Sequence, residues 1–376
     1  MPVQPGDLDE LPEVVTARLA RGGFRRDRLL RWAAEASLPS DETNLLADVS
    51  LSHPEDIVPA PLPGSTEEKR LRALGDEAIA RGKVALVVLA GGMATRMGGA
   101  VKALVEVLPG LTFLEARLRG RAHLSRVTQV EQPLWLMTSE ATDEAIRAAL
   151  GDALDGRSVA LFPQEVSLRL TRDGDLFRDA SGEVSVYPTG HGDIPDALRR
   201  SELLARFLER GGETLWITNL DNLGATIDPA LLGMHLDAKK ELSVEVVDKA
   251  GDRGGVPVRV GGRPVIAEEY RLPKGFDASQ IDVFNTNTML ASAEAILRYD
   301  APFTYCVVEK KVGDRVAIQR ERLLGELTFH LPTQFVRVPR TGVRSRFLPV
   351  KDHDELGPRR ADLELVTRAR GMQPSG

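Results

Sequence analysis

The feature that most constrains this chain is an uninterrupted apolar run, Val84–Ala90, that continues into a glycine-rich loop at residues 89–102. A continuous apolar run of this length is typical of a parallel strand buried on both faces. Glycines directly after such a strand, here Gly91 and Gly92, let backbone N–H groups approach a phosphate closely. The loop matches neither the Walker A pattern nor the Gly-x-Gly-x-x-Gly dinucleotide pattern, which argues against a P-loop kinase or a dehydrogenase.

Strand-like and helix-like segments alternate along the rest of the chain. Further short apolar runs occur at Leu134–Met137, Val159–Phe162, Thr214–Thr218 and Val244–Val247, and helical patterns at Thr142–Leu150 and Asp196–Arg210. The capping-box spacing Ser/Thr-x-x-Glu predicts helix starts at Ser65 and Thr112, the first helix ending at Gly82. This alternation predicts an α/β fold with a doubly wound, mostly parallel sheet.

The pattern divides the chain into three parts. Residues 1–64 are expected to form an N-terminal helical segment, with Leu29 and Trp32 on one face, followed by an irregular Pro-rich connection. Residues 65–330 are expected to form the α/β core. Residues 331–376 are expected to be a C-terminal segment that ends in a surface helix and a frayed tail.

Composition excludes several classes of function. The net charge of −6 argues against wholesale nucleic-acid binding, and the single cysteine, Cys306, argues against a disulfide framework or a multi-cysteine zinc site. Val84–Ala90 is too short to cross a bilayer, and the N-terminus lacks the pattern of a signal peptide. We therefore expect a cytoplasmic protein with no nucleic-acid or membrane partner.

Two loops carry residues suited to binding an anionic ligand. Asp221 follows the apolar run Thr214–Thr218, so it would lie at the carboxyl end of a strand, in a position to hold Mg²⁺. The alternative is that this segment is an Asx-rich turn that caps a helix, with Asp228 before Pro229. His191 stands between two glycines, where little covers a side chain, so contact with a ligand is favoured over a place in the core.

A basic stretch near the C-terminus is the last candidate. Residues 337–351 carry four arginines and one lysine without an acidic residue, which indicates either a polyanionic ligand or a solvated basic face. The solvated face is favoured for most of the four arginines. Lys351, which follows Leu348, Pro349 and Val350, is the exception and is predicted to contact a ligand.

Taken in order, these motifs resemble the eukaryotic-type UDP-sugar pyrophosphorylase family, and within it the glucose enzymes. The matching pieces are the glycine-rich loop, Leu136–Ser139, Phe162–Gln164, Gly190–Asp193, Asp221–Asp228, Lys249–Gly255, Phe284–Asn287 and Arg346–Lys351. The resemblance implies a Rossmann-like sheet of the nucleotide-diphospho-sugar transferase type. It also implies Mg²⁺-dependent transfer of UMP from UTP to a sugar 1-phosphate, giving UDP-glucose and pyrophosphate.

The resemblance further implies roles for individual residues. Nucleotide contacts would come from Gly91, Gly92, Met137, Gln164 and Gly190. Contacts with the sugar phosphate would come from His191, Asn219, Gly255, Glu268 and Asn285, with Glu269 as the alternative to Glu268. Lys351, Arg96 and Lys102 would act on the reacting phosphates, and Asp221 would coordinate Mg²⁺.

Several departures from the family pattern keep alternatives open. Ala94 replaces the last glycine of the loop, and Met97–Lys102 is about one residue short. Only 20 residues follow Leu356, so the left-handed β-helix domain of the glucose enzymes is not expected, and the oligomeric state stays open, a monomer included. Glu77–Val84 resembles the N-acetylglucosamine enzymes instead. That sugar, a broader UDP-sugar specificity, or a non-catalytic nucleotide-sugar-binding protein are the alternatives.

Overall fold

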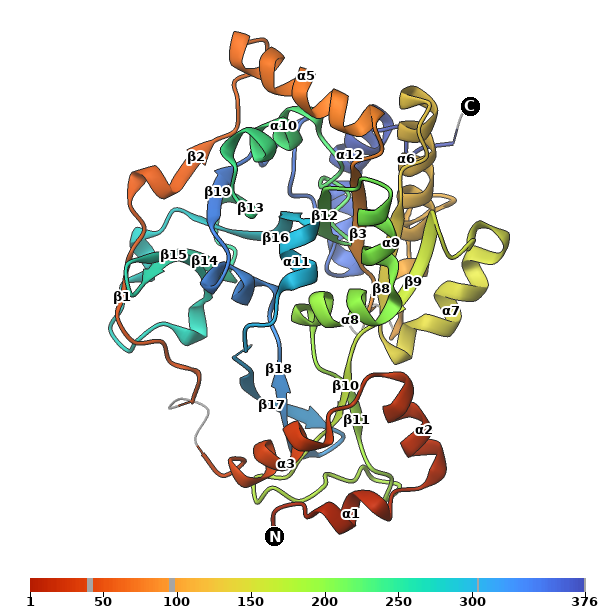
Figure 1. Cartoon of the computed structure of the whole chain (residues 1–376), viewed down its shortest axis with the longest axis vertical. Coiled ribbons are helices and arrows are strands. Elements are labelled where there is room, and N and C mark those ends of the chain that lie inside the picture. Colours follow the sequence, from red (N-terminus) through yellow and green to blue (C-terminus); the bar gives the residue numbers. More distant parts are fainter. Residues whose placement is uncertain (39–42, 95–98, 303, 375–376) are drawn as a thin grey trace.

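The structure is a computed structural model that describes residues 1–38, 43–94, 99–302 and 304–374. Its centre is an eight-stranded sheet flanked by helices (Figure 1). In spatial order the strands are β2 (Ile57–Pro59), β19 (Thr333–Arg337), β13 (Leu242–Asp248), β16 (Val283–Ser292), β12 (Thr214–Asn219), β3 (Val84–Leu89), β8 (Leu134–Thr138) and β9 (Val159–Pro163). Only β16 runs antiparallel to its neighbours in this sheet, so the predicted α/β class with a mostly parallel sheet is confirmed.

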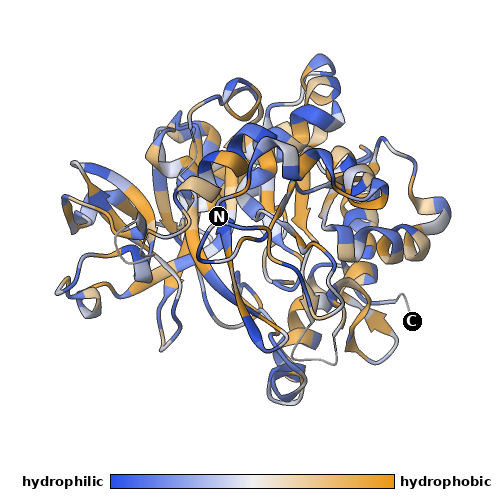
Figure 2. Ribbon diagram, turned by 90° about the horizontal axis from the view of Figure 1, so that it is seen from below, coloured by the Kyte–Doolittle hydropathy of each residue, from blue (hydrophilic) through white to orange (hydrophobic). Residues whose placement is uncertain are grey.

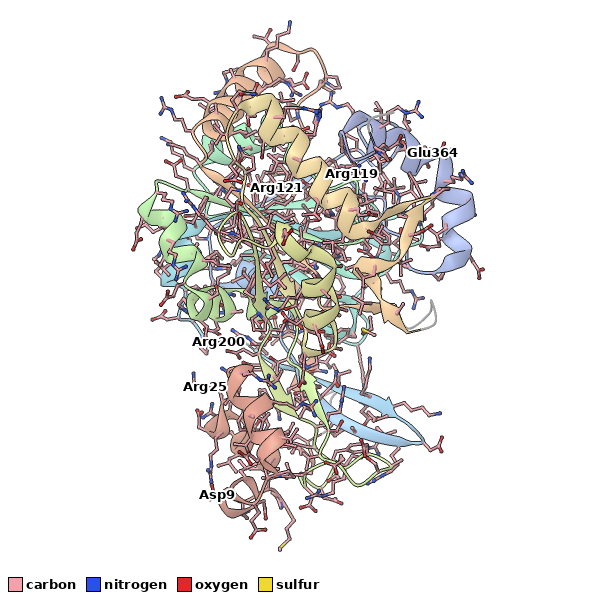
Figure 3. The ribbon with its side chains drawn as sticks, turned by 90° about the vertical axis from the view of Figure 1, so that its right-hand side faces the viewer. Asp9, Arg25, Arg119, Arg121, Arg200 and Glu364 are labelled. Atoms are coloured by element: carbon pink, nitrogen blue, oxygen red, sulfur yellow. The ribbon has the colours of Figure 1, made fainter. Side chains whose placement is uncertain are left out.

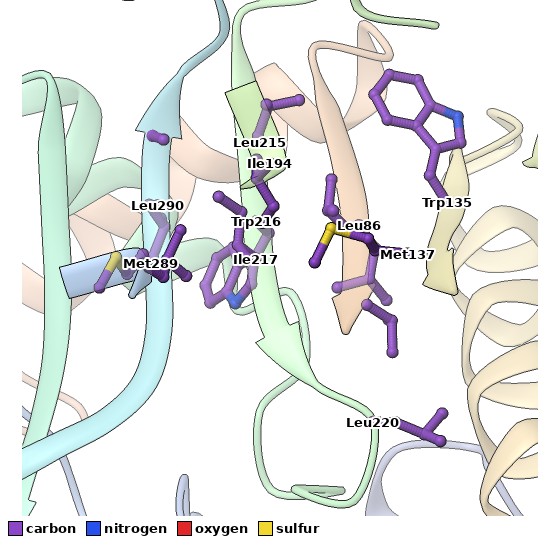
Figure 4. Close-up of a cluster of buried hydrophobic side chains, with 14 of the residues drawn as sticks. Leu86, Trp135, Met137, Ile194, Leu215, Trp216, Ile217, Leu220, Met289 and Leu290 are labelled. Atoms are coloured by element: carbon purple, nitrogen blue, oxygen red, sulfur yellow. The ribbon is translucent and has the colours of Figure 1, made fainter. Parts of the chain in front are cut away.

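Strands β3 and β12 fix the position of the candidate site. They pair in parallel register from Val84–Thr214 to Leu89–Asn219, so the loops after both strands leave the same edge of the sheet. Both strands are buried almost throughout, and they pack with β8 and β16 around Trp216 (Figure 4). The hydrophobic stretches of the ribbon gather in these central strands (Figure 2).

The helices follow the predicted capping signals closely. They are α5 (Thr66–Ala80), α6 (Phe113–Thr128), α7 (Glu140–Leu150), α8 (Ile194–Ser201), α9 (Leu203–Glu209), α10 (Pro229–Ala238), α11 (Ala293–Arg298) and α12 (His353–Ala369). The side-chain oxygens of Ser65 and Thr112 accept backbone N–H bonds at 3.0 and 3.1 Å, as predicted. The reciprocal bond of a full capping box forms at Thr112 only, because Glu68 accepts from the Gly64 N–H instead of from that of Ser65. The single helix expected at 196–210 is wrong: Glu202, with a φ of 61°, breaks it into α8 and α9.

The N-terminal helices form a second hydrophobic core at one end of the molecule (Figure 1). Helices α1 (Pro5–Asp9), α2 (Glu13–Arg21) and α3 (Arg26–Ala34) pack on two hairpins, β10 (Val166–Leu168) with β11 (Val186–Pro188), and β17 (Cys306–Val312) with β18 (Arg315–Glu321). Leu29 and Trp32 are buried there, as their spacing predicts.

Two other expectations are corrected. The Pro-rich connection is partly regular, because β2 adds an edge strand beside β19 and β1 (Val49–Leu51) pairs with β14 (Gly255–Val260) and, through it, β15 (Arg263–Glu268). Proline at Pro59 is compatible with an edge strand, where a missing N–H donor is tolerated. The C-terminal helix α12 is more than a surface helix, since Leu363 and Val366 are buried in the main core.

Short hairpins complete the described fold near the glycine-rich loop, β4 (Met93–Ala94) with β5 (Ala100–Val101), and β6 (Glu106–Leu108) with β7 (Leu111–Thr112). In the part of the chain that the structure describes, no helix is both long and apolar enough to span a bilayer.

Candidate active site

The glycine-rich loop meets the chain after β9 at Gly91. The side-chain amide of the buried Gln164 lies 3.0 Å from the point where a Cβ of Gly91 would be, so glycine leaves room for this side chain. The hydroxyl of Ser139 donates to the Gly91 carbonyl at 2.8 Å and fixes the loop. A Cβ at Gly92 would meet only open space. The structure therefore brings together Gly91 and Gln164, both predicted nucleotide contacts.

Three other predicted positions in this region have different outcomes. The Met137 side chain is fully buried in the main core (Figure 4), and its carbonyl accepts the Ala90 N–H at 2.8 Å, so the side chain itself does not face the loop. Arg96 lies outside the described residues. Ala94 is in extended strand β4, paired with Ala100, so the backbone there does not need the positive φ that glycine would supply.

Lys102 and Asp221 form an ion pair at the centre of this edge of the sheet. The ammonium of Lys102 donates to Asp221 Oδ2, and less than a fifth of either side chain is exposed. Asp221 leaves the carboxyl end of β12, as its position in the sequence predicts. Among the described residues no group of three or more His, Cys, Asp or Glu side chains could hold a metal ion, so Asp221 would contribute a single carboxylate.

Arg117, which sequence reasoning missed, holds the loop that carries Asp221. It is buried on α6 and donates to four main-chain oxygens, those of Asn219 (2.7 Å), Leu220 (3.3 Å), Asn222 (2.7 Å) and Ala225 (2.7 Å). Burial lowers its pKa to about 10. The available signal was its spacing, because Arg117 lies four residues after Phe113 and therefore on the apolar face of the predicted helix.

The same loop binds the C-terminal segment that carries Lys351. Asn222 donates to the Arg346 carbonyl at 3.0 Å and accepts from the Leu348 N–H at 2.8 Å. A Cβ at Gly224 would come within 2.9 Å of the Arg346 backbone, so glycine permits this close approach. The Asp221 loop and the lysine segment are thus joined by the Asn222 side-chain amide, which hydrogen-bonds to the backbone of the lysine segment.

The arginines of the basic stretch form ion pairs with acidic side chains, and Arg346 is buried, so they do not form the solvated face that was expected for most of them. Each pairs with a carboxylate: Arg337 with Asp248, Arg340 with Asp252, Arg344 with Glu68 and Arg346 with Glu245. Lys351 differs, because 46% of its side chain is exposed and its ammonium lies 3.4 Å from Asp252. It is the least constrained cation of this segment.

A bulge in β16 adds asparagines to the site. The register between β13 and β16 shifts beside Glu245, and Asn287 takes a φ of 59°. Its side-chain amide donates to Asn219 Oδ1 at 2.9 Å, while its N–H donates to Asn285 Oδ1 at 2.9 Å. The structure thus joins the predicted residues Asn219 and Asn285 through Asn287, to which no role had been assigned.

The remaining predicted sugar contacts, Gly255 and Glu268, lie opposite one another on β14 and β15. Glu268 Oε1 lies 3.0 Å from the position of a Gly255 Cβ, and burial raises the pKa of the Glu268 carboxyl. Glu269 is paired with Lys249 at 2.7 Å. Of the two adjacent glutamates, Glu268 is therefore the one beside Gly255.

The loop with Gly190 and His191 wraps around a buried arginine, Arg322. Gly190 has a φ of 118°, and a Cβ there would overlap the Arg322 carbonyl oxygen. His191 Nδ1 accepts the Leu324 N–H at 2.9 Å, and burial lowers the pKa of its imidazole to about 4. The imidazole is therefore neutral at pH 7 and its Nε2 carries the proton.

These features define the class of protein, an α/β protein whose phosphate-suited residues gather at the carboxyl ends of two central strands. Its fold is similar to that of a UDP-glucose phosphorylase from Trypanosoma brucei (TM-score 0.73, 22% identity, 90% of this chain and 76% of the other). It is also similar to the uridine diphosphate N-acetylglucosamine pyrophosphorylase of the same organism (TM-score 0.70, 21% identity, 91% of this chain and 81% of the other).

Sequence similarity narrows the class to one family. A sequence profile described as UTP–glucose-1-phosphate uridylyltransferase matches residues 39–368, and the chain belongs to this family. It is 30% identical over 302 residues to the UTP–glucose-1-phosphate uridylyltransferase of Solanum tuberosum, covering 76% of this chain and 62% of that protein. It is 29% identical over 312 residues to a probable enzyme of that name from Schizosaccharomyces pombe, covering 77% and 60%. The chain thus spans about 60% of the length of these relatives.

Proposed function

We propose that this protein is a UTP–glucose-1-phosphate uridylyltransferase built on a Rossmann-like sheet. It transfers UMP from UTP to glucose 1-phosphate and releases pyrophosphate. Family membership supports this activity. The observation that carries it is the meeting of Gly91 and Gln164 with the Lys102–Asp221 pair at one edge of the sheet.

The reaction needs charge neutralisation more than a base. A phosphate monoester has its second pKa near ~6, so the attacking oxygen of the sugar phosphate is already mostly ionised at neutral pH. That oxygen forms the new bond to the α-phosphorus of UTP while the bond to the bridging α,β-oxygen breaks and pyrophosphate leaves. The side chains of Lys102, Lys351 and Arg96 neutralise the phosphates in this step. Asn219 faces the ligand and is positioned by its hydrogen bond from Asn287.

Asp221 is the residue that would hold Mg²⁺. Mg²⁺ takes one or two carboxylates and completes its shell with phosphate oxygens and water, so a single buried carboxylate suits it. Asp221 already balances a cation, the ammonium of Lys102, which fits this role. When bound, the ion would supply part of the charge neutralisation of the triphosphate.

The proposal is tested by measuring pyrophosphate release when the protein is given UTP, Mg²⁺ and one sugar phosphate at a time. The sugar phosphates are glucose 1-phosphate, N-acetylglucosamine 1-phosphate and galactose 1-phosphate, and a parallel series contains EDTA. We expect turnover to be fastest with glucose 1-phosphate, lost with EDTA and lost in Asp221→Ala. The matched control is Asp314→Ala, which removes an exposed carboxylate in the β17–β18 turn. A preference for an amino sugar would change the substrate. UTP binding without turnover on any sugar would contradict the enzymatic activity.

A further inference from the structure

A cavity lies toward the opposite ends of the central strands from the candidate active site. Leu86, in the first half of β3, and Pro133, immediately before β8, line it, so it lies toward the amino ends of these strands. Helix α6, on which Figure 3 labels Arg121, contributes five lining residues, and segments 226–228, 343–346 and 369–372 contribute most of the others. The cavity has a volume of about 350 Å³, within the range of small-molecule sites.

Arginines dominate the polar lining of this cavity. Six of them line it: Arg72, Arg117, Arg121, Arg344, Arg346 and Arg370. Four have carboxylate partners. Glu68 accepts from Arg72 at 3.0 Å and from Arg344 at 2.9 Å, Glu245 pairs with Arg346, and Glu131 pairs with Arg121.

The other two arginines donate to main-chain oxygens. Arg370 donates to the carbonyls of Leu223 at 3.0 Å and Ser345 at 2.7 Å, and Arg117 makes the four carbonyl contacts described above. The cavity has one acidic lining residue, Asp228, whose Oδ1 caps α10. Among the lining residues, six guanidinium groups thus face a single carboxylate, a local concentration of positive charge in a chain whose net charge is −6.

The environment of this cavity disfavours that excess charge. Burial lowers the pKa of Arg117 to about 10, although attraction to Asp221 opposes the shift. Burial, together with repulsion from Arg346, lowers the pKa of Arg370 to about 9. A bound anion would offset both effects. Its charge would be held by planar guanidinium groups, which match phosphate oxygens in geometry.

We propose that this cavity binds a small organic phosphate, at a site separate from the substrates. Arg117 and Arg370, which donate to carbonyls rather than to carboxylates, supply two positive charges and so match a phosphomonoester dianion. The apolar part of the lining, which includes Leu124, Ile227 and Met372, suits the carbon skeleton of such a ligand. Arg117 also holds the carbonyls of Asn219 and Leu220, so occupancy is transmitted to the loop that carries Asp221.

Isothermal titration calorimetry with phenyl phosphate tests the site in the full-length protein. We expect phenyl phosphate to bind at one saturable site at an ionic strength of about 0.15 M, where long-range attraction between exposed charges is screened. This binding should persist when saturating UTP and Mg²⁺ occupy the substrate site. Arg344→Gln removes a lining cation while Glu68 keeps Arg72 as its partner, and Arg370→Gln removes an uncompensated cation. Each is expected to weaken binding by roughly tenfold or more, because a charge-assisted hydrogen bond is lost.

The control is Arg206→Gln, which removes an exposed arginine of α9 paired with Glu202; helix α9 contributes no residue to the lining of the cavity. It is expected to leave the affinity unchanged. The proposal is overturned if phenyl phosphate does not bind, if UTP displaces it, or if both cavity variants bind it as the wild type does. Should Arg370→Gln fail to fold, the partly exposed Arg344 still decides the result. Binding is scored apart from pyrophosphate release, so failure of either proposal is seen independently.

Discussion

Lys102 and Lys351 differ in how tightly the structure holds their ammonium groups. Lys102 is largely buried against Asp221, whereas Lys351 is 46% exposed and 3.4 Å from Asp252. A long, partly exposed ion pair is weak, so Lys351 can turn toward a substrate phosphate at little cost. At the scale of single residues, Lys351 is therefore the cation best placed to follow the changing charge of the reacting phosphates.

Replacement of this lysine tests that role. We expect Lys351→Ala to lower kcat by about 10²–10³, the usual effect of losing one electrostatic contact to a transition state. Steady-state pyrophosphate release measures the change. Lys311→Ala, which removes an exposed lysine on β17, is the matched control and should keep wild-type kcat. A loss of less than roughly tenfold for Lys351→Ala would remove the residue from the mechanism.

Between helices, close packing of α5 on α10 depends on two glycines. A Cβ at Gly75 would overlap the Pro229 carbonyl oxygen, and a Cβ at Gly233 would overlap that of Leu71. Glycine in a helix interior normally costs stability relative to alanine. Here the absence of a side chain lets the two helix backbones touch. This contact holds α10 in place, and α10 in turn fixes the end of the loop that begins at Asp221.

Alanine at these positions is therefore expected to destabilise the protein despite its higher helix propensity. Gly75→Ala and Gly233→Ala should each lower the free energy of unfolding by about 1–3 kcal/mol through overpacking. Gly6→Ala, in helix α1 with open space around the new Cβ, should be neutral or slightly stabilising. Urea denaturation measures all three. Stabilisation by either of the first two variants would show that the helices can separate without cost.

The contact between α10 and β13 contains a titratable group. His235 on α10 is buried, its Nδ1 lies 2.8 Å from the Ser243 hydroxyl, and that hydroxyl also accepts from Gln334 at 2.8 Å. Burial lowers the pKa of His235 to about 4. The unfolded chain then binds a proton that the folded chain does not, so stability is complete above about pH 6.5 and is lost as the pH falls toward 4.

A difference measurement isolates this effect. His191 acts with the same sign, whereas Asp193, whose pKa burial raises to about 7, makes stability fall as the pH rises. We therefore compare the wild type with His235→Asn by urea denaturation between pH 4.5 and 6. The wild type should lose up to about 1.4 kcal/mol per pH unit relative to the variant. Parallel stability–pH profiles of the wild type and His235→Asn would mean that His235 is protonated in the folded protein as it is in the unfolded chain. His53→Asn, at an exposed position, serves as the control.

Elements with strong local signals could be predicted from the sequence, and those fixed by tertiary contact could not. The apolar run of β3 and the capping boxes of α5 and α6 place these elements correctly because burial and capping act over a few residues. Strand β16 has polar residues at Asn285 and Asn287, and its bulge arises only when it pairs with β13. The break at Glu202 has the same origin, since its φ of 61° is a conformation that local propensity does not favour.

The candidate site divides in the same way. Family motifs locate Asp221, Asn219 and Lys351, because each lies in a recognisable sequence context. Arg117 belongs to no such motif, and its four carbonyl partners come from a loop about a hundred residues further along the chain. A side chain that acts by satisfying a distant loop leaves only the weak signal of a charge on an apolar helix face.

At the scale of the whole molecule, two hydrophobic cores are joined by a buried ion cluster. Arg322 lies 3.1 Å from Asp193 and 3.5 Å from Glu165, and Arg28 on α3 lies 2.7 Å from Glu165. Glu165 follows Gln164, and Asp193 follows the loop with His191. The cluster thus connects the N-terminal helices to the part of the candidate site that contains Gln164 and His191, while hydrophobic packing stays separate in the two cores.

Separate cores predict that the smaller one can open while the central sheet stays folded. Leu29→Ala, at a fully buried position in the second core, should cost about 2–5 kcal/mol through the lost burial and the cavity left behind. In hydrogen exchange measured by mass spectrometry, α2, α3 and the β17–β18 hairpin should lose protection, while β3 and β12 keep it. Val14→Ala, at a position 72% exposed on α2, should leave exchange unchanged. Equal loss of protection in β3 and β12 would contradict the prediction, because the ion cluster would then make the two cores unfold as one unit.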